Sequence, residues 1–462
     1  EIDCVIITTP PSTHAKLIIK SLRAGKHVFV EKPLVVNMAE AKMVERDQYI
    51  SVTTNPALIK SYLEGLLATP TGRAQVLSWV KPTETVSREE RINDLMAAVI
   101  TDLANRVIAI MKDKVKGKPV YFSVELDPRN SQNIDASIKE AREWADRIGR
   151  ENLMVKVLAT PEAVQENGII ETLLKEGIQV NVTGIMYPEQ YEQVVAAYFR
   201  AGANMASFAS VFVSRWMKPA ADLVLRLVRE GKITTADQLK AAVIKFGGLP
   251  NAITITEYHD TFLRHFGRRL PAGFNAETDF SNLDFDRMQY FLVASNSNKV
   301  GDYLKRILAG LQDSPELLRG LEAAEAEIKS HFADDVHFAP LQGPYVLPTT
   351  PQKTLDYVAA QGMVPRATIL EGVDAARALL QEAQASGMDI TAEGKKLYAE
   401  GEAAFVKDYE QTIASLGEIV DEALAAGQTQ VDMTTAGHPV VPGPEGARHD
   451  NDDAAMTTDA IP

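Results

Sequence analysis

The chain has 462 residues, of which 45% are hydrophobic and 24% are charged, a balance typical of a soluble globular protein. Its 48 basic residues against 62 acidic ones give a net charge of −14, which argues against nucleic acid or an anionic membrane as the main partner. The length predicts two or three domains, or one large barrel with additions.

Cysteine content and the start of the chain indicate the compartment. Cys4 is the single cysteine, so no internal disulfide can form and a reducing, cytoplasmic location is expected. No apolar run approaches the roughly 20 residues of a membrane span. The opening EIDCVIITTP has neither a Met nor a basic segment, so we expect no signal peptide and a truncated chain.

The first 42 residues read as one strand–helix–strand unit. Strands are predicted at 3–9 and 26–34, with a helix at 13–25 between them. The run ITTPPSTHAKLIIKSLRAGKHVFVEKPL resembles the later half of the nucleotide-binding domain of the Gfo/Idh/MocA oxidoreductases. In that family the Gly-rich turn for the pyrophosphate lies earlier, and no G-x-G-x-x-G occurs in this chain. We therefore expect an incomplete Rossmann half at 1–42 and no bound cofactor.

Eight predicted strands, each followed by a helix, define the fold expected for the rest of the chain. An α/β TIM-type (β/α)8 barrel is indicated, with the 1–42 segment supplying its first strand and with additional helices. An open doubly wound sheet is the alternative. The barrel is assigned to 43–426, and the polar, Gly- and Pro-rich tail 427–462 is expected to be disordered. The strands are predicted at 26–31, 51–54, 118–125, 152–158, 178–183, 206–212, 289–295 and 344–348.

One of these strands carries a lysine among apolar residues. Lys156 lies within ENLMVKVLAT, and Thr160 and Pro161 then predict a capped helix start. Burial would lower the pKa of Lys156, and a neutral amine can form a Schiff base with a carbonyl. The alternative is a structural lysine whose ammonium reaches water.

Polar residues gather at the predicted C-terminal ends of the strands. An amine, a carboxylate, hydroxyls, an amide and two cations suit carbonyl chemistry on a phosphorylated sugar, because the cations can hold phosphate. Taken singly, each could be a cap or loop residue. The set is Asn55, Glu125, Lys156, Thr183, Ser210, Arg215, Ser295 and Lys299.

Seven separated motifs in this part of the chain are similar to those of transaldolases, in the same order. They are TTNPALI, SVELDPR, NLMVKVLATPE, GIQVNVTGI, ASVFVSRW, VASNSNK and LQGPYVLPTTPQKTLDYV. The resemblance covers roughly residues 50–425. It implies transfer of a dihydroxyacetone unit between sugar phosphates: sedoheptulose 7-phosphate and glyceraldehyde 3-phosphate give erythrose 4-phosphate and fructose 6-phosphate, in the pentose phosphate pathway.

The resemblance also implies a role for each site residue. Lys156 matches the Schiff-base lysine, and Glu125 with Thr183 matches the pair that orders the catalytic water. The substrate-binding matches are Asn55 and Ser210 for hydroxyls, Arg215 for phosphate, and Ser295 and Lys299 at the end of the β-strand near 289–295, Lys299 as a second phosphate cation. Neither a metal nor an organic cofactor is implied.

The sequence departs from the transaldolase pattern at the first strand. That strand carries an acid/base aspartate in the family, and no matching strand is visible here. Glu31, in HVFVEKPL, could present a carboxylate at the same place, or the first strand could complete the barrel without chemistry. The alternative functions are an inactive or sugar-phosphate-binding barrel arising from an abnormal fusion, and an NAD-dependent Gfo/Idh/MocA-type oxidoreductase. The expected oligomeric state is a monomer or homodimer.

Overall fold

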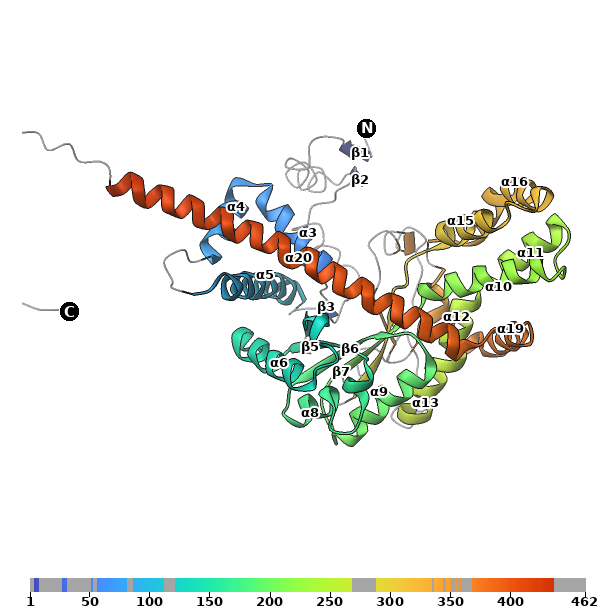
Figure 1. Ribbon diagram of the computed structural model, residues 1–462, viewed down its shortest axis with the longest axis horizontal. Helices are drawn as coiled ribbons and strands as arrows, with labels where there is room; N and C mark the ends of the chain where they lie inside the picture. The colour runs from blue at the N-terminus through green and yellow to red at the C-terminus, as the bar shows by residue number, and fades with distance from the viewer. Residues whose placement is uncertain are drawn as a thin grey trace, which may run out of the picture.

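The protein is described by a computed structural model (Figure 1). It covers residues 4–7, 27–30, 51–52, 56–80, 86–111, 121–267, 288–334, 336–343, 346–349, 354, 357–358 and 368–435.

The centre of the molecule is a parallel sheet of seven strands in the order β3-β4-β5-β6-β7-β8-β9. Every neighbouring pair is parallel, and every residue of β4, β5, β7 and β8 is buried. Such burial on both faces is typical of parallel sheets, because the crossover helices cover the sheet. The strands are β3 (Ser51–Val52), β4 (Tyr121–Glu125), β5 (Leu153–Leu158), β6 (Gln179–Ile185), β7 (Ser207–Phe212), β8 (Gln289–Ala294) and β9 (Val346–Pro348).

The strand predicted at 26–31 lies outside this sheet. It forms β2 (His27–Val30), and all four of its residues pair in parallel with β1 (Cys4–Ile7) in a separate two-stranded sheet. All eight predicted segments therefore contain strands, but only seven of them join. The expected α/β class is confirmed, but in the described part of the chain the strands form a half-barrel sheet of seven strands and not the closed eight-stranded barrel expected, since β2 pairs with β1 and not with the large sheet.

Helices follow almost every strand of the large sheet. Between β3 and β5 lie α3 (Pro56–Leu67), α4 (Pro70–Trp79), α5 (Arg88–Met111), η1 (Pro128–Asn130) and α6 (Ile134–Ile148). The middle of the chain contains α7 (Pro161–Val164), α8 (Ile169–Lys175), α9 (Pro188–Arg200), η2 (Ser214–Trp216), α10 (Met217–Arg229), α11 (Ala236–Phe246), α12 (Leu249–Ile253), η3 (Thr254–His259) and α13 (Asp260–Phe266). The last part contains α15 (Val300–Gly310), α16 (Pro315–His331), η6 (Ala339–Leu341), α18 (Thr368–Glu371), α19 (Val373–Ala385) and α20 (Ile390–Thr435).

Local sequence explains where these helices begin. The Thr160 hydroxyl accepts a hydrogen bond from the Ala163 N–H at 3.1 Å, with Pro161 at the first helical position, so the predicted cap is present. Thr235 and Gln238 form a reciprocal capping box at the start of α11. These caps satisfy N–H groups that the first turn of a helix leaves free.

Helix α20 is the longest element, with 46 residues, and crosses the molecule diagonally (Figure 1). It contacts α3 and α5 on one side of the large sheet, where Arg88 Nη2 lies 2.9 Å from Asp421 Oδ2. It also contacts β6, η1 and η2, which border the ends of the strands. The helix ends at Thr435, so it continues past residue 427, where the sequence predicts the start of a disordered tail. Residues 436–462 lie outside the described part of the chain.

The core is built from large aromatic side chains on the helices and strands. Trp216, Tyr191, Tyr258 and Phe291 are all fully buried, and the rings of Tyr191 and Phe291 lie 5.7 Å apart. Contacts of this kind hold α9 and η3 against β8. None of the described helices is long and apolar enough to cross a membrane.

Candidate active site

Lys156 and Glu125 form the centre of the candidate site. They are direct partners in the register of β5 and β4, so their side chains project from the same face of the sheet. Lys156 Nζ lies 3.3 Å from Glu125 Oε2, and the two side chains are 10% and 5% exposed. Burial raises the pKa of Glu125, an effect that Lys156 opposes and the charge of Asp408 reinforces. The pair therefore holds a lysine and a carboxyl group in direct contact, largely away from water.

A polar network extends from this pair across β4, β6 and β7. Asn181 is the register partner of Lys156, donates to the Ser123 hydroxyl at 3.1 Å and accepts from the Ser210 hydroxyl at 2.9 Å. The sequence analysis missed Asn181. Its signal was the alternation in QVNVTGI, which places Asn181 two residues before Thr183 and hence on the same face.

Thr183 lies on the same face, as the register partner of Leu158, two residues beyond Lys156. Its hydroxyl oxygen is buried and has no hydrogen-bond partner among the described residues, and the same holds for Glu125 Oε1. Buried polar atoms in folded proteins normally have a partner. A water or substrate hydroxyl could supply it here.

Gly184 explains the irregular end of β6. Its φ is +74°, a left-handed conformation that L-residues rarely adopt, and the register with β7 shifts between Val182 and Ile185. A Cβ at this position would lie 3.1 Å from Leu158 Cδ2. The glycine thus allows the bulge that follows Thr183 while Leu158 packs closely against it.

Replacing Gly184 with alanine should lower the free energy of unfolding by about 1–2 kcal/mol, the cost of a left-handed backbone with a Cβ. Chemical denaturation of the purified variant measures this. Gly202→Ala is the matched control, because Gly202 has φ +62° but no atom within 4 Å of its Cβ position. Both variants should lose stability, and Gly184→Ala should lose more. Equal stability of Gly184→Ala and the parent would contradict this role.

Helix α20 packs over Lys156 through Phe405. Lys156 Nζ lies 5.7 Å from the ring centroid of Phe405, which also contacts Phe212 with ring centroids 5.9 Å apart. Asp408 follows Phe405 by about one helical turn, on the same side, and its charge acts on Glu125. Sequence reasoning did not find these two residues, because nothing local in α20 distinguishes them from the other residues of an amphipathic helix.

The turn after β4 is held by its own ion pair. Arg129 Nη2 lies 2.6 Å from Asp127 Oδ2, and the guanidinium lies over the Tyr409 ring at 5.5 Å. The Glu140 carboxyl group on α6 accepts a hydrogen bond from the Asp127 backbone N–H at 2.9 Å. Burial raises the pKa of Glu140 to about 7. These contacts fix the backbone immediately after Glu125.

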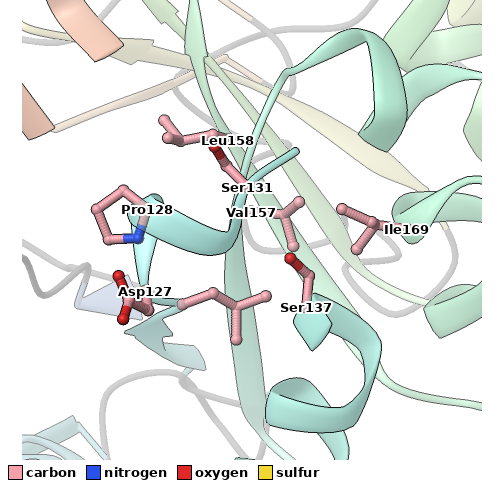
Figure 2. Close-up of a pocket in the computed structure, with 8 residues that line it drawn as sticks. Asp127, Pro128, Ser131, Ser137, Val157, Leu158 and Ile169 are labelled. Carbon is pink, nitrogen blue, oxygen red and sulfur yellow. The ribbon is translucent and has the colours of Figure 1, made fainter. Parts of the chain in front are cut away.

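Figure 2 shows how closely this turn packs against β5. Asp127, Pro128 and Ser131 surround the end of the strand and leave a cavity of about 10 Å³, enough for one water molecule. Val157 points toward Ile169 and Ser137, whereas Leu158 points to the opposite face. Lys156, two residues before Leu158, lies on the Leu158 face by the alternation of the strand.

At the ends of β7 and β8, the predicted residue Ser295 contacts Ser214, which was not predicted. The Ser214 and Ser295 hydroxyls lie 2.9 Å apart, and the Ser214 N–H donates to the Ser295 carbonyl at 2.8 Å. Ser295 has a φ of +50°, and Arg215 is the exposed residue next to Ser214. Lys299 lies at the start of α15, about half exposed, with its Nζ 3.6 Å from Asp302 Oδ2. Its ammonium is thus already paired.

Two predicted residues cannot be placed. Glu31 and Asn55 lie outside the described residues, so their roles stay predictions. Among the side chains that the structure describes, no group of three or more His, Cys, Asp or Glu residues could hold a metal ion.

A buried amine beside a carboxyl group, on the face of a parallel α/β sheet, defines a site of the kind used for covalent chemistry on carbonyl groups. The model of the Transaldolase/Fructose-6-phosphate aldolase family matches residues 28–416, and the chain belongs to this family. Residues 1–46 match the model of the oxidoreductase family with an NAD-binding Rossmann fold. Both resemblances predicted from the motifs are confirmed.

Curated relatives agree with the family assignment over most of the chain. The transaldolase of Thiobacillus denitrificans is 27% identical over 409 residues, which cover 86% of this chain and 98% of the relative. The transaldolase of an Arthrobacter species is 25% identical over 398 residues, which cover 84% of this chain and 91% of the relative. The transaldolase of Mycobacterium tuberculosis is 26% identical over 402 residues, which cover 83% of this chain and 89% of the relative.

Proposed function

We propose that this protein is a transaldolase that transfers a dihydroxyacetone unit between sugar phosphates through a Schiff base on Lys156. The observation that carries the proposal is the buried Lys156–Glu125 pair, with 3.3 Å between Nζ and Oε2, in a chain of the transaldolase family. The substrates proposed are sedoheptulose 7-phosphate and glyceraldehyde 3-phosphate, which give erythrose 4-phosphate and fructose 6-phosphate.

Imine formation is the first step of the proposed mechanism. The Lys156 amine attacks the ketose carbonyl carbon, and the carbonyl oxygen leaves as water after taking up two protons. Glu125 is suited to donate a proton to that oxygen, because burial raises its pKa and keeps it protonated to higher pH. The Thr183 hydroxyl, buried without a partner in the described part of the chain, supports a role in holding the water.

Cleavage and transfer follow on the same lysine. The bond between the α- and β-carbons of the Lys156-bound imine, C3–C4 of the ketose, breaks. The C4 hydroxyl gives its proton to Glu125, which became a carboxylate during imine formation, and leaves as the aldehyde of the aldose phosphate. The electron pair stays with the lysine-bound three-carbon unit as an enamine. A second aldose phosphate then takes up this unit, and water releases the product. Asn181 and Ser210 are positioned for hydroxyl contacts on the same face of the sheet. Arg215, an exposed guanidinium beside the Ser214–Ser295 pair, is proposed to hold the phosphate.

A transfer assay tests the proposal. Fructose 6-phosphate and erythrose 4-phosphate are supplied together, and the glyceraldehyde 3-phosphate formed is followed by a coupled enzyme. The proposal expects turnover that requires erythrose 4-phosphate. Equal release of glyceraldehyde 3-phosphate without the acceptor would indicate an aldolase rather than a transferase. No release by a folded sample would favour a protein that binds sugar phosphates without chemistry.

A further inference from the structure

A second cavity lies between α10, α15 and the first half of α20. Its volume is about 370 Å³, within the range of small-molecule sites. Arg215 itself does not line the cavity, although Lys218, three residues later, does.

The positive and negative charges of the residues that line this cavity do not balance. Three pairs are internally satisfied: Arg306 Nε lies 2.6 Å from Asp222 Oδ1, Lys396 Nζ lies 2.8 Å from Glu393 Oε1, and Lys218 pairs with Glu400. Two guanidiniums remain, those of Arg226 and Arg229, and neither has a carboxylate in ion-pair contact among the described residues. The lining thus carries two more cations than carboxylates, and the charges of Arg226 and Arg229 also act on the Glu230 carboxylate just outside it.

Arg226 is held in place but not fully satisfied. Its Nη1 donates to the Gly387 carbonyl at 2.8 Å, which fixes the guanidinium against the turn before α20. Its Nε is buried and has no hydrogen-bond partner in the described part of the chain. Arg229 follows by about one helical turn and is exposed, so both side chains lie on one side of α10. Because Arg226 Nε is itself buried, an anion in the cavity would be held by the charge and the remaining guanidinium N–H groups of Arg226 together with Arg229.

The rest of the cavity wall is apolar. Pro219 and Leu223 come from α10, while Met388 and Leu397 come from the turn before α20 and from α20 itself, and all four are buried. Inorganic phosphate would leave this wall unused. A ligand with a carbon skeleton beside its charged group would cover it.

We propose that this cavity binds a small organic phosphate monoester, with Arg226 and Arg229 contacting the phosphate and the apolar wall covering the carbon skeleton. The charge matches, because a phosphate monoester carries about −1.5 to −2 at neutral pH. Guanidinium groups also offer the planar donor geometry that phosphate oxygens prefer. The site joins α10 to α20 and does not depend on the proposed transfer activity.

Calorimetric titration with glycerol 3-phosphate tests the site in the Arg215→Gln protein, which removes the other proposed phosphate contact. Glycerol 3-phosphate has no carbonyl, so it cannot react with Lys156. We expect one binding event, weakened at least about tenfold by adding Arg229→Gln, because a charge-assisted contact is lost. Arg226→Lys, which keeps the charge but loses the planar guanidinium, should also bind more weakly.

The matched control is Arg377→Gln on α19, which removes one exposed cation outside the cavity. It should leave the affinity unchanged, and melting curves show whether each variant is folded. An equal loss in Arg377→Gln would mean non-specific attraction and overturn the proposal. So would unchanged binding in Arg229→Gln, or no binding at millimolar glycerol 3-phosphate. Equal affinity for inorganic phosphate would overturn the organic part of the assignment.

Discussion

Replacing Lys156 with methionine should abolish transfer, with a fall in kcat/KM on the order of 10⁶-fold, the scale seen when a covalent nucleophile is removed. Methionine has a similar length and fits a buried apolar strand, so the fold should survive. The change leaves Glu125 buried without its counterion, which should keep that carboxyl protonated. The coupled transfer assay at saturating fructose 6-phosphate measures the effect.

The control for this variant is Lys139→Met on α6. Lys139 is 77% exposed and pairs only with Glu143 on its own helix, so its loss should leave kcat within experimental error. Circular dichroism and a melting curve establish that both variants are folded. Residual activity within about a hundredfold of the parent in folded Lys156→Met would exclude lysine-based covalent catalysis.

Replacing Glu125 with glutamine should lower kcat by about 10²- to 10⁴-fold, the usual contribution of a general acid–base group. Glutamine keeps the shape of the side chain and can still accept a hydrogen bond from Lys156, but it cannot carry the transferred proton. We expect the lysine adduct to form more slowly but to the same final extent. Rapid-mixing measurements of adduct formation separate these two quantities.

Glu143→Gln, an exposed carboxylate on α6, is the matched control for the charge change. Its kcat should equal that of the parent. If Glu125→Gln turned over at the parent rate, the carboxyl group would be structural. Asp408 on α20 would then be the next carboxylate to test, because the charge of Asp408 already raises the pKa of Glu125.

Much of the fold could be predicted from local patterns. The apolar runs around Lys156 and Thr183 are strands within one or two residues of their predicted bounds, and Thr160 caps its helix. These features depend on side-chain periodicity and capping, which a short stretch of sequence contains. The Lys156–Glu125 contact followed from both residues lying near the C-terminal ends of adjacent parallel strands.

The features that could not be predicted depend on partners far away in sequence. Strand β2 pairs with β1 instead of joining the large sheet, and an apolar run such as HVFV has the same pattern in either place. Phe405 reaches Lys156 only because α20 crosses the ends of the strands. Asn181 is different: its alternation with Thr183 was visible in the sequence and indicates the shared face.

The most direct test of imine chemistry is borohydride reduction in the presence of fructose 6-phosphate, followed by tryptic peptide mass spectrometry. A modified Lys156 would block cleavage, so the adduct should appear on the peptide 151–175, between Arg150 and Lys175. We predict a reduced dihydroxyacetone adduct on that peptide, absent in Lys156→Met. A folded protein that gave only unmodified 151–156, or an adduct on another lysine, would contradict the proposed mechanism.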